Sequence, residues 1–362
     1  MVVSRTVSDV LDRHQKVRSI LSRISYGKFL FWRLKVKAGN SPEELTTSKI
    51  CMVNPETIEY CLSGKLPRHQ YQTGHVPVLS GDWDLLDKRI EDLVENSTSN
   101  REDFQNANAD SNGGQITVAI GRFGDFLLTD GLNILLKAKR LQVQQIPALI
   151  SARHSQWQEL RKEVYTLALE KRLYQPTTHP DLDMIAEHSC EDRFNMIRDN
   201  LSVKRGSSSA RVLDIGANHG YFCQKFEELG FKCYAVENGL INLHYLRRFK
   251  RASNKKFEVV PEGIFKWKGV KELQFDVVLA LNIFHHFLKR KKPYSQLIDL
   301  LNGLQVKEMF FEPHLPGEYQ MKNAYKNYTE KEFVEFVLQN SKLKRAKPIG
   351  AANDGRTLYK LF

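Results

Sequence analysis

The sequence of 362 residues predicts an α/β protein whose C-terminal part is a doubly wound, mostly parallel sheet that ends in an antiparallel hairpin. Two observations carry this prediction. Residues 211–222 read as an apolar strand that leads directly into a glycine-bracketed turn and a helix, as strands covered on both faces do. Near the end of the chain, Asn353-Asp-Gly355 is a strong turn signal between two strand-like segments. A smaller α+β domain is expected upstream of this sheet.

The turn after the first strand indicates which ligand the sheet binds. Gly216 and Gly220 bracket it, and the helix expected from Tyr221 to Leu229 points its positive N-terminal end at the ligand. The spacing is neither the G-x-G-x-x-G of dinucleotide sites nor the G-x-x-x-x-G-K-[ST] of phosphate loops. Asp214 could hold an ammonium group, and Glu237 at the end of the next strand suits a ribose diol. This pair of acids favours S-adenosylmethionine (SAM) over NAD.

From about residue 206 to residue 362, the sequence resembles the class I SAM-dependent methyltransferases. The order of its parts carries the resemblance, because three more strands, a helix and a hairpin follow at residues 257–262, 275–287, 307–313, 328–340, and 347–349 with 357–362. The resemblance implies a Rossmann-like sheet with SAM at the carboxyl ends of its strands. It assigns cofactor binding to Asp214, Gly216, Asn218, Gly220, Tyr221, Glu237, Asn238, Glu262 and Asn282.

Candidate catalytic residues follow the fourth strand, where the reactive methyl group is expected to lie. Methyl transfer is an in-line displacement, so the protein must orient the acceptor and take up its proton. His285 and His286 are candidate general bases, because histidine has an ordinary pKa of about 6.5, and Asn282 is expected to position substrate or cofactor. Adjacent helical residues diverge by about 100°, so only one of the two histidines can face the site.

Glu312 and His314 form a second candidate pair after the fifth strand. Strand ends of a parallel sheet open on one edge, so both residues are expected near the two histidines as catalytic-site residues. Two histidines with a carboxylate could hold a divalent metal. The spacing matches no metal-binding signature, however, so a hydrogen-bonded lining is favoured and no metal site is predicted.

The positive charge is concentrated at the N-terminus. The formal net charge is +12, and residues 1–40 hold nine Lys or Arg and two acids, which gives 9 − 2 = +7. This segment also contains aromatic residues, so it could lie on nucleic acid or an anionic membrane. The alternative is a helix that docks its apolar side on the protein and leaves its cations solvated. Two further cationic clusters at residues 247–256 and 289–292 suggest an anionic acceptor, although solvated faces explain them equally well.

Residues 115–165 resemble the ParB-like family. Two strand-like runs around a glycine turn, a helix, a third strand and a second helix are expected at residues 116–131, 132–141, 146–150 and 157–173. In that family a cationic pair commonly follows the glycine that opens the first helix, whereas Leu132, Asn133 and Ile134 follow it here. Without those cations a phosphate site loses its charge-assisted contacts, so scaffolding or substrate recruitment is favoured over hydrolysis.

The chain is thus expected to have four parts: a basic, mainly helical segment (1–75), the ParB-like domain (76–170), a helical linker (171–205) and the methyltransferase domain (206–362). Four local expectations accompany this division: a helix at residues 57–62, an extended segment at 76–83, a mobile loop at 96–115 and a flexible joint at 206–209.

General features favour a cytoplasmic enzyme. No apolar run approaches the roughly 20 residues of a membrane span, and the N-terminus lacks a signal-peptide pattern. The five cysteines form no C-x-x-C pair, which favours reduced, mostly buried thiols over disulfides or zinc ligands.

These observations predict a SAM-dependent methyltransferase that acts on an anionic, sugar-linked or lipid-linked small acceptor, on oxygen. One alternative is RNA or DNA methylation, with the basic N-terminus as the recruiting region. DNA-base methylation is disfavoured, because Asn282-Ile-Phe-His285 stands where such enzymes carry Asn-Pro-Pro-Tyr or Asp-Pro-Pro-Tyr. The other alternative is a non-catalytic scaffold protein that binds SAM.

Overall fold

The computed structural model describes residues 26–37, 45, 47–59, 116–203, 210–315 and 317–362. The chain forms two compact units. The N-terminal unit extends to Leu173 and also includes Thr177–Met184 and Arg251–Asn254. The C-terminal unit consists of Tyr174–Pro176, Ile185–Lys250 and Lys255–Phe362.

The C-terminal unit is built on a seven-stranded sheet in the order β11-β12-β10-β9-β6-β7-β8. The strands are β6 (Arg211–Ile215), β7 (Lys232–Val236), β8 (Glu258–Val260), β9 (Gln274–Leu281), β10 (Gln305–Glu312), β11 (Ala346–Ala351) and β12 (Thr357–Leu361). The central strands pair in parallel, and only β12 runs antiparallel to its neighbours β10 and β11. The predicted parallel sheet with a terminal antiparallel hairpin is confirmed.

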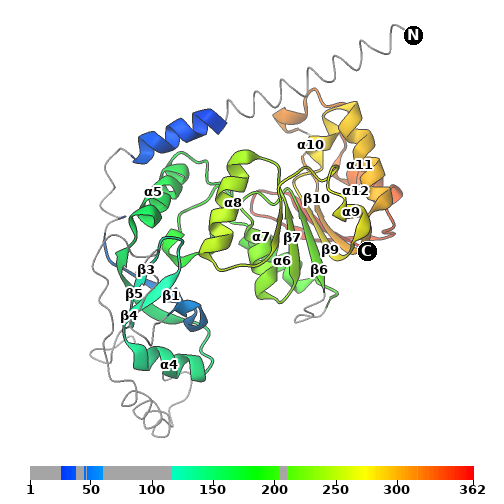
Figure 1. The fold of residues 1–362 in the computed structure, drawn as a ribbon. Helices are drawn as coiled ribbons and strands as arrows, with labels where there is room; N and C mark the ends of the chain where they lie inside the picture. The colour runs from blue at the N-terminus through cyan, green and yellow to red at the C-terminus, as the bar shows by residue number, and fades with distance from the viewer. Residues whose placement is uncertain (1–25, 38–44, 46, 60–115, 204–209, 316) are drawn as a thin grey trace. The chain divides into compact units, whose positions relative to one another are not determined.

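Helices cover both faces of this sheet, which makes it doubly wound (Figure 1). One face packs against α6 (Glu191–Asp199), α7 (Tyr221–Glu228) and α8 (Leu240–Ala252). The other face packs against α9 (Gly269–Glu272), α10 (His285–Leu288), α11 (Lys291–Gly303) and α12 (Glu330–Gln339). Since successive strand residues point to opposite faces, a central strand such as β9 must be apolar on both faces, as its residues 277–281 are.

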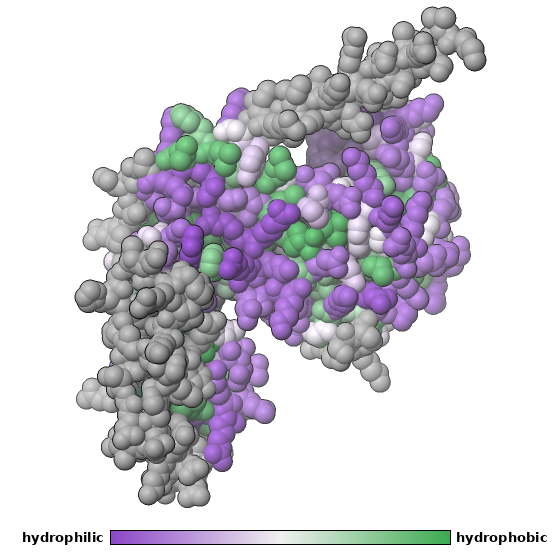
Figure 2. All heavy atoms as spheres, in the orientation of Figure 1, coloured by the Kyte–Doolittle hydropathy of each residue, from purple (hydrophilic) through white to green (hydrophobic). Residues whose placement is uncertain are grey.

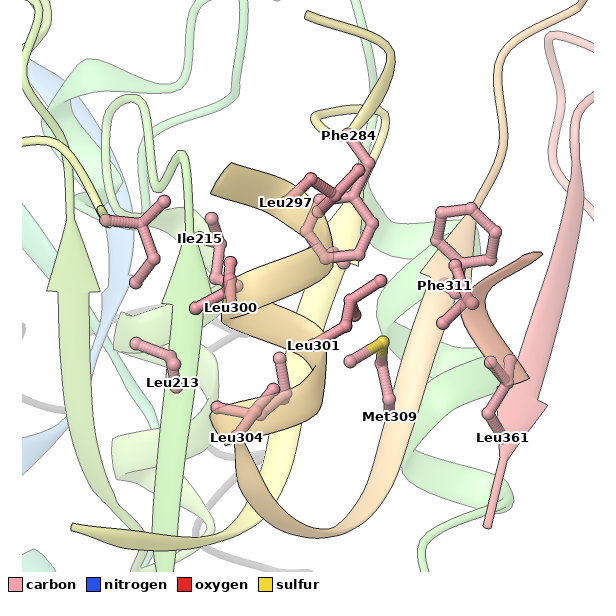
Figure 3. Close-up of a cluster of buried hydrophobic side chains, with 14 of the residues drawn as sticks. Leu213, Ile215, Phe284, Leu297, Leu300, Leu301, Leu304, Met309, Phe311 and Leu361 are labelled. Atoms are coloured by element: carbon pink, nitrogen blue, oxygen red, sulfur yellow. The ribbon is translucent and has the colours of Figure 1, made fainter. Parts of the chain in front are cut away.

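The core beneath α11 shows how the sequence fixes this packing. Leu297, Leu300, Leu301 and Leu304 recur at helical spacing and face side chains from β6, β10 and β12 (Figure 3). Burying a leucine contributes roughly 1.5–3 kcal/mol, so this apolar stripe holds α11 on the sheet. The connection from β9 to β10 therefore returns across one face and leaves the carboxyl ends of both strands at one edge.

The N-terminal unit contains a five-stranded mixed sheet in the order β1-β5-β3-β4-β2. Its strands are β1 (Lys49–Val53), β2 (Ile58–Glu59), β3 (Ile116–Ile120), β4 (Phe126–Asp130) and β5 (Ile146–Arg153). Its labelled helices are η2 (Pro55–Thr57), α4 (Leu132–Arg140), α5 (Ser155–Leu169) and η4 (Pro180–Leu182). The element order expected between residues 116 and 173 is confirmed.

The helix expected at residues 57–62 is wrong in its described part. Ile58 and Glu59 form β2, which pairs with β4, and β1 just before it pairs antiparallel with β5. These pairings bury Val53 and Ile58, and their backbone hydrogen bonds outweigh local propensity. The mainly helical character expected for residues 1–75 therefore does not hold for 47–59. In the linker expected at 171–205, α6 is the α-helix among the described residues and η4 a single short turn.

Residues 26–37, the described part of the basic segment, form a helix. Arg33 makes a 2.7 Å ion pair with Glu163, the Trp32 indole donates to Glu170 at 3.0 Å, and Phe29 is buried. These contacts favour docking on the protein for this part of the segment. Residues 1–25 and 38–40, like the expectations for 60–62, 76–83, 96–115 and 206–209, lie outside the described residues.

On the face that Figure 2 shows, hydrophilic residues make up most of the described surface. None of the described helices is long and apolar enough to cross a membrane. Cys51, Cys190, Cys223 and Cys233 are free and buried, as predicted for reduced thiols.

Candidate active site at the carboxyl edge of the sheet

The glycine turn between β6 and α7 requires unusual backbone conformations. Gly216 and Gly220 have φ angles of +78° and +84°, and Asn218 between them has φ +52°. A Cβ atom at Gly216 would lie 2.7 Å from Cδ1 of Ile283, so both space and backbone demand glycine there. The predicted turn is therefore a tight loop at the carboxyl end of β6.

The Glu237 carboxylate is held by the backbone at the end of β7. It accepts hydrogen bonds from the amides of Asn218 at 3.0 Å, Asn238 at 2.9 Å and Gly239 at 2.7 Å. These bonds fix its orientation, and Oε2, which accepts only from Asn218, keeps acceptor capacity for a ligand hydroxyl. The Asn238 side chain is exposed and lies against Gly263, next to Glu262, which follows β8. The residues expected on the ribose and adenine side are thus gathered at neighbouring strand ends.

Asp214 is buried in β6, and its carboxylate lies 3.7 Å from the thiol of Cys223. Burial, together with the negative charge of Glu237, raises the pKa of Asp214 to about 7. A ligand ammonium group beside it would favour the carboxylate form. The chemistry of this residue therefore fits the cationic end of a SAM molecule.

The rings of Tyr221 and His219 pack in the hydrophobic core. Tyr221 is buried and packs edge-to-face on Phe222, and the His219 ring packs against Tyr245 and Phe249. The Tyr221 ring belongs to the cluster beneath α6 and α7, so a cofactor contact by Tyr221 stays a prediction.

Two residues that sequence analysis had left in a linker lie directly on this edge. The Gln175 side-chain oxygen accepts hydrogen bonds from the amides of His219 at 3.2 Å and Tyr221 at 3.4 Å. The Tyr174 hydroxyl forms a hydrogen bond with the side chain of Asn282. No local pattern in the sequence marks either residue, because both contacts are with strand ends and turns more than 40 residues away.

The predicted acceptor side contains three histidines. His285 is 2% exposed, His286 is exposed, and their ring centroids lie 4.0 Å apart. His314 is also buried, with its ring 5.8 Å from that of His285. The structure thus brings together the predicted residues from the ends of β9 and β10, and it orients the two adjacent histidines differently, as expected. Among the described residues, no group of three or more potential ligands could hold a metal ion.

Several buried polar atoms at this edge have no hydrogen-bond partner in the described part of the chain. They are the side-chain oxygens of Asn218 and Asn282, both ring nitrogens of His285 and the Nδ1 atom of His314. Nε2 of His314 lies 2.8 Å from Oδ1 of Asn327. Because an oxygen can only accept, this contact places the proton on Nε2 and leaves a lone pair on Nδ1. A buried polar atom without a partner costs about 1–3 kcal/mol, so this concentration indicates a place for a polar ligand.

Glu312 has a different environment from the one expected for a catalytic carboxylate. Its oxygens bind the Arg193 guanidinium at 2.5 and 3.2 Å, and Arg193 also reaches Asp354 in the hairpin turn at 2.6 Å. The buried Glu312 carboxylate therefore joins α6 to the end of β10 and the terminal hairpin. The Glu312 carbonyl in turn accepts from the Asn282 amide at 3.2 Å, so this residue positions the site through its backbone.

Charged groups also border the histidines. Lys289, from one of the cationic clusters, lies 3.3 Å from Nδ1 of His286 and donates to Gln320 at 2.8 Å. Although partial burial acts in the opposite direction, hydrogen bonds from Gln320, the Leu315 amide and Arg356 lower the pKa of Glu318 to about 2. The site margin thus carries both a cation and a permanent anion.

Comparison with known proteins identifies the domain type. Residues 190–312 match the family described as a methyltransferase domain, so the C-terminal half contains such a domain. No curated protein matches the sequence. The ParB-like resemblance of residues 115–165 receives no support from these comparisons.

Several solved structures are similar to part of this chain at low identity. The bifunctional kinase-methyltransferase WbdD is 19% identical with a TM-score of 0.44, over 55% of this chain and 45% of that one. The methyltransferase domain of bacterial CtHen1-CN is 13% identical with a TM-score of 0.37, over 47% of this chain and 97% of that one. The PH0226 protein from Pyrococcus horikoshii OT3 is 13% identical with a TM-score of 0.36, over 48% and 88%. The chain spans slightly less than half the length of the WbdD structures.

Proposed function

We propose that the C-terminal unit transfers a methyl group from SAM to a hydroxyl of a small acceptor that is anionic or linked to a sugar or lipid. The observation that carries the proposal is the convergence of unpartnered acceptor atoms on Asn282, His285 and His314. A hydroxyl group can both donate and accept a hydrogen bond, so a polyhydroxylated acceptor would satisfy several of these atoms at once. Lys289 beside His286 supports a negatively charged acceptor.

The residues on the other side of the edge fit the cofactor. Glu237 Oε2 can accept from a ribose hydroxyl, Asp214 can neutralise an ammonium group, and the Asn218 oxygen has no partner within the described chain. When bound, SAM supplies a methyl group activated by a sulfonium. The protein then needs to exclude water, orient the acceptor oxygen in line with that methyl group and remove one proton.

The two buried histidines divide these tasks. Burial, together with the nearby His286 and Lys289, lowers the pKa of His285 to about 3, so His285 stays neutral and can orient the acceptor by donating its one N–H to the hydroxyl oxygen. His314 is held by Asn327 in the tautomer that leaves Nδ1 free to take up the proton. The Asn282 side chain is bonded to Tyr174, and its unpartnered oxygen can accept a hydrogen bond from the acceptor or the cofactor.

The N-terminal unit serves in this proposal as an accessory that recruits or orders the acceptor. The buried Asp181 cluster of this unit is fully bonded, to Arg153 and to the Trp157 indole, which suits a structural role for that cluster. A ParB-like scaffold without hydrolytic activity is consistent with the missing cationic pair after Gly131.

The test uses SAM labelled in its methyl group and a panel of acceptors: sugar acids, nucleotide sugars, glycolipids, RNA and DNA. We expect label in an anionic hydroxyl acceptor, loss of transfer with unchanged SAM affinity in His314→Asn, and a raised KM in Lys289→Met. Transfer to RNA or DNA would replace the acceptor class with nucleic acid. SAM binding without transfer to any acceptor would favour the scaffold role.

A further inference from the structure

Residues Tyr174–Pro176 form a short segment, here called the strap, that belongs to the C-terminal unit although both flanks belong to the N-terminal unit. It precedes the residues that match the methyltransferase family, which begin at residue 190. Gln175 is 6% exposed, and its side-chain oxygen accepts from the amides of His219 and Tyr221. Because both partners are N–H donors, the carboxamide orientation is fixed: Oε1 faces the turn and Nε2 faces away from it.

The hydrogen bonds of the turn explain why this contact matters. The amides of Gly216 and Ala217 donate to the Val236 carbonyl, that of Asn218 to Glu237, and that of Gly220 to the Ala217 carbonyl. The remaining two amides of the turn, those of His219 and Tyr221, are both taken by Gln175. These two amides at the N-terminal end of α7 are therefore taken by a neutral carboxamide and are not open to an anionic ligand.

Because Gln175 takes these two amides, its own NH2 group is the hydrogen-bond donor left beside the turn. No group among the described residues accepts a hydrogen bond from Nε2. Two amides at a helix N-terminus polarise the carboxamide through Oε1, which strengthens Nε2–H as a donor to an anion. Asp214 lies at the beginning of the same turn and suits an ammonium group. Asp214 can bind the ammonium group of an amino acid, and the Gln175 NH2 group can donate a hydrogen bond to its carboxylate. The two residues together thus match both charges of an amino acid.

We infer that Gln175 is a cofactor-binding residue that donates from Nε2 to the carboxylate of the methionine part of SAM. The inference rests on the proposed function, since it deepens the assignment of the SAM site. Tyr174 is a positioning residue, because its hydroxyl bonds to Asn282 and holds the strap between the turn and the end of β9. Its ring also packs edge-to-face on His188, 4.5 Å away between centroids.

The decisive variant is Gln175→Glu. A glutamate keeps an oxygen for both amides and favours the helix N-terminus by its charge, so the turn should remain intact. It has no N–H to donate and repels a carboxylate. The matched control is Gln305→Glu. Gln305 begins β10, at the end of the strand away from the candidate site, and its side chain binds Lys342.

Binding is measured by calorimetry on the full chain with two ligands, SAM and 5′-methylthioadenosine, which lacks the amino-acid part. We expect Gln175→Glu to weaken SAM binding by about tenfold or more, and methylthioadenosine binding by less than about twofold. The thermal midpoint should be unchanged or higher, and Gln305→Glu should bind both ligands normally. Tyr174→Phe should weaken SAM binding by a smaller factor.

Two results overturn the inference while leaving the proposed function intact. One is wild-type affinity for SAM in Gln175→Glu; the other is an equal loss for both ligands, which shows a purely structural role. A wild-type chain that binds neither ligand overturns the proposed function itself, and the inference with it.

Discussion

Two buried histidines, one in each unit, differ in a way that separates structure from function. His179 is 3% and His285 2% exposed, and burial is the largest factor that lowers the pKa of the first to about 4 and of the second to about 3. Both nitrogens of His179 have partners: Nε2 lies 2.8 Å from the Gly124 carbonyl, and Nδ1 accepts from the Asp181 amide at 3.2 Å. Neither nitrogen of His285 has one in the described chain.

The surroundings of the two histidines repeat this contrast. Next to His179, the Asp181 carboxylate is bound by Arg153 and by the Trp157 indole, and Arg161 lies 3.0 Å away. Near His285, the buried side-chain oxygen of Asn282 has no partner within the described residues. A saturated polar cluster stabilises a fold, whereas an unsaturated one at the carboxyl edge of a parallel sheet indicates where a ligand binds.

The largest expected effect belongs to the saturated cluster. Asp181→Ala would leave Arg153 and Arg161 buried without their carboxylate, so the free energy of unfolding should fall by about 3–5 kcal/mol. Urea unfolding followed by Trp157 fluorescence measures this loss. SAM affinity of the folded protein should not change. An unfolding energy equal to that of the wild type would break the comparison.

Low pH should lower the free energy of unfolding through His179, which belongs to the same cluster. The pKa of His179 is about 4 in the folded chain, against an ordinary 6.5. As the pH falls, His179 is therefore protonated in the unfolded chain at a higher pH than in the folded chain. Stability is therefore complete above pH 6.5 and falls as the pH drops toward 4, by about 1.4 kcal/mol per pH unit for this group. Unfolding energies of His179→Phe at pH 7, 6 and 5 should show a shallower slope. The same slope as in the wild type would mean that other groups cause the acid sensitivity.

His285→Phe should affect turnover and spare stability. The change removes two unpartnered nitrogens from a buried position, so the free energy of unfolding should stay equal or rise. Transfer should slow by about 100-fold, the range for losing a group that orients the acceptor, with SAM affinity unchanged. Steady-state rates and calorimetry test both parts. Unaltered turnover would assign His285 to the core.

The smallest effect concerns Asp214 and its pKa of about 7. Below that pH the free carboxyl is protonated and must lose its proton to hold an ammonium group. Affinity for SAM should therefore fall by about tenfold per pH unit as the pH drops below 7, and be constant above it. Calorimetry at pH 6, 7 and 8 provides the measurement. Asp214→Asn should bind weakly and without this slope; a slope that persists would come from another group.

Local patterns predicted the sheet better than they predicted the surroundings of the site. The strand-turn-helix at residues 211–228 and the hairpin at Asn353-Asp-Gly355 depend on residues that are close in the sequence, and both are confirmed. The strands β1 and β2 were missed because they are stabilised by pairing with β5 and β4, whose residues lie far along the chain.

The same limit applies to single side chains. Glu312 was correctly placed at the end of β10, but its partner Arg193 is 119 residues away, and no sequence pattern links the two. Gln175 was overlooked entirely, because its significance comes only from the two amides it meets. Residue type and strand position predict which groups gather at an edge. Whether each of these groups has a hydrogen-bond partner depends on tertiary contacts.

The strap has a practical consequence for dissecting the molecule. A fragment that begins at residue 190, where the family match begins, would lack Tyr174 and Gln175 and would leave the amides of His219 and Tyr221 uncovered. The C-terminal unit is thus not one uninterrupted stretch of chain. Its first residue is Tyr174, and a gene fragment cut to include that codon should yield a more complete domain than the shorter one.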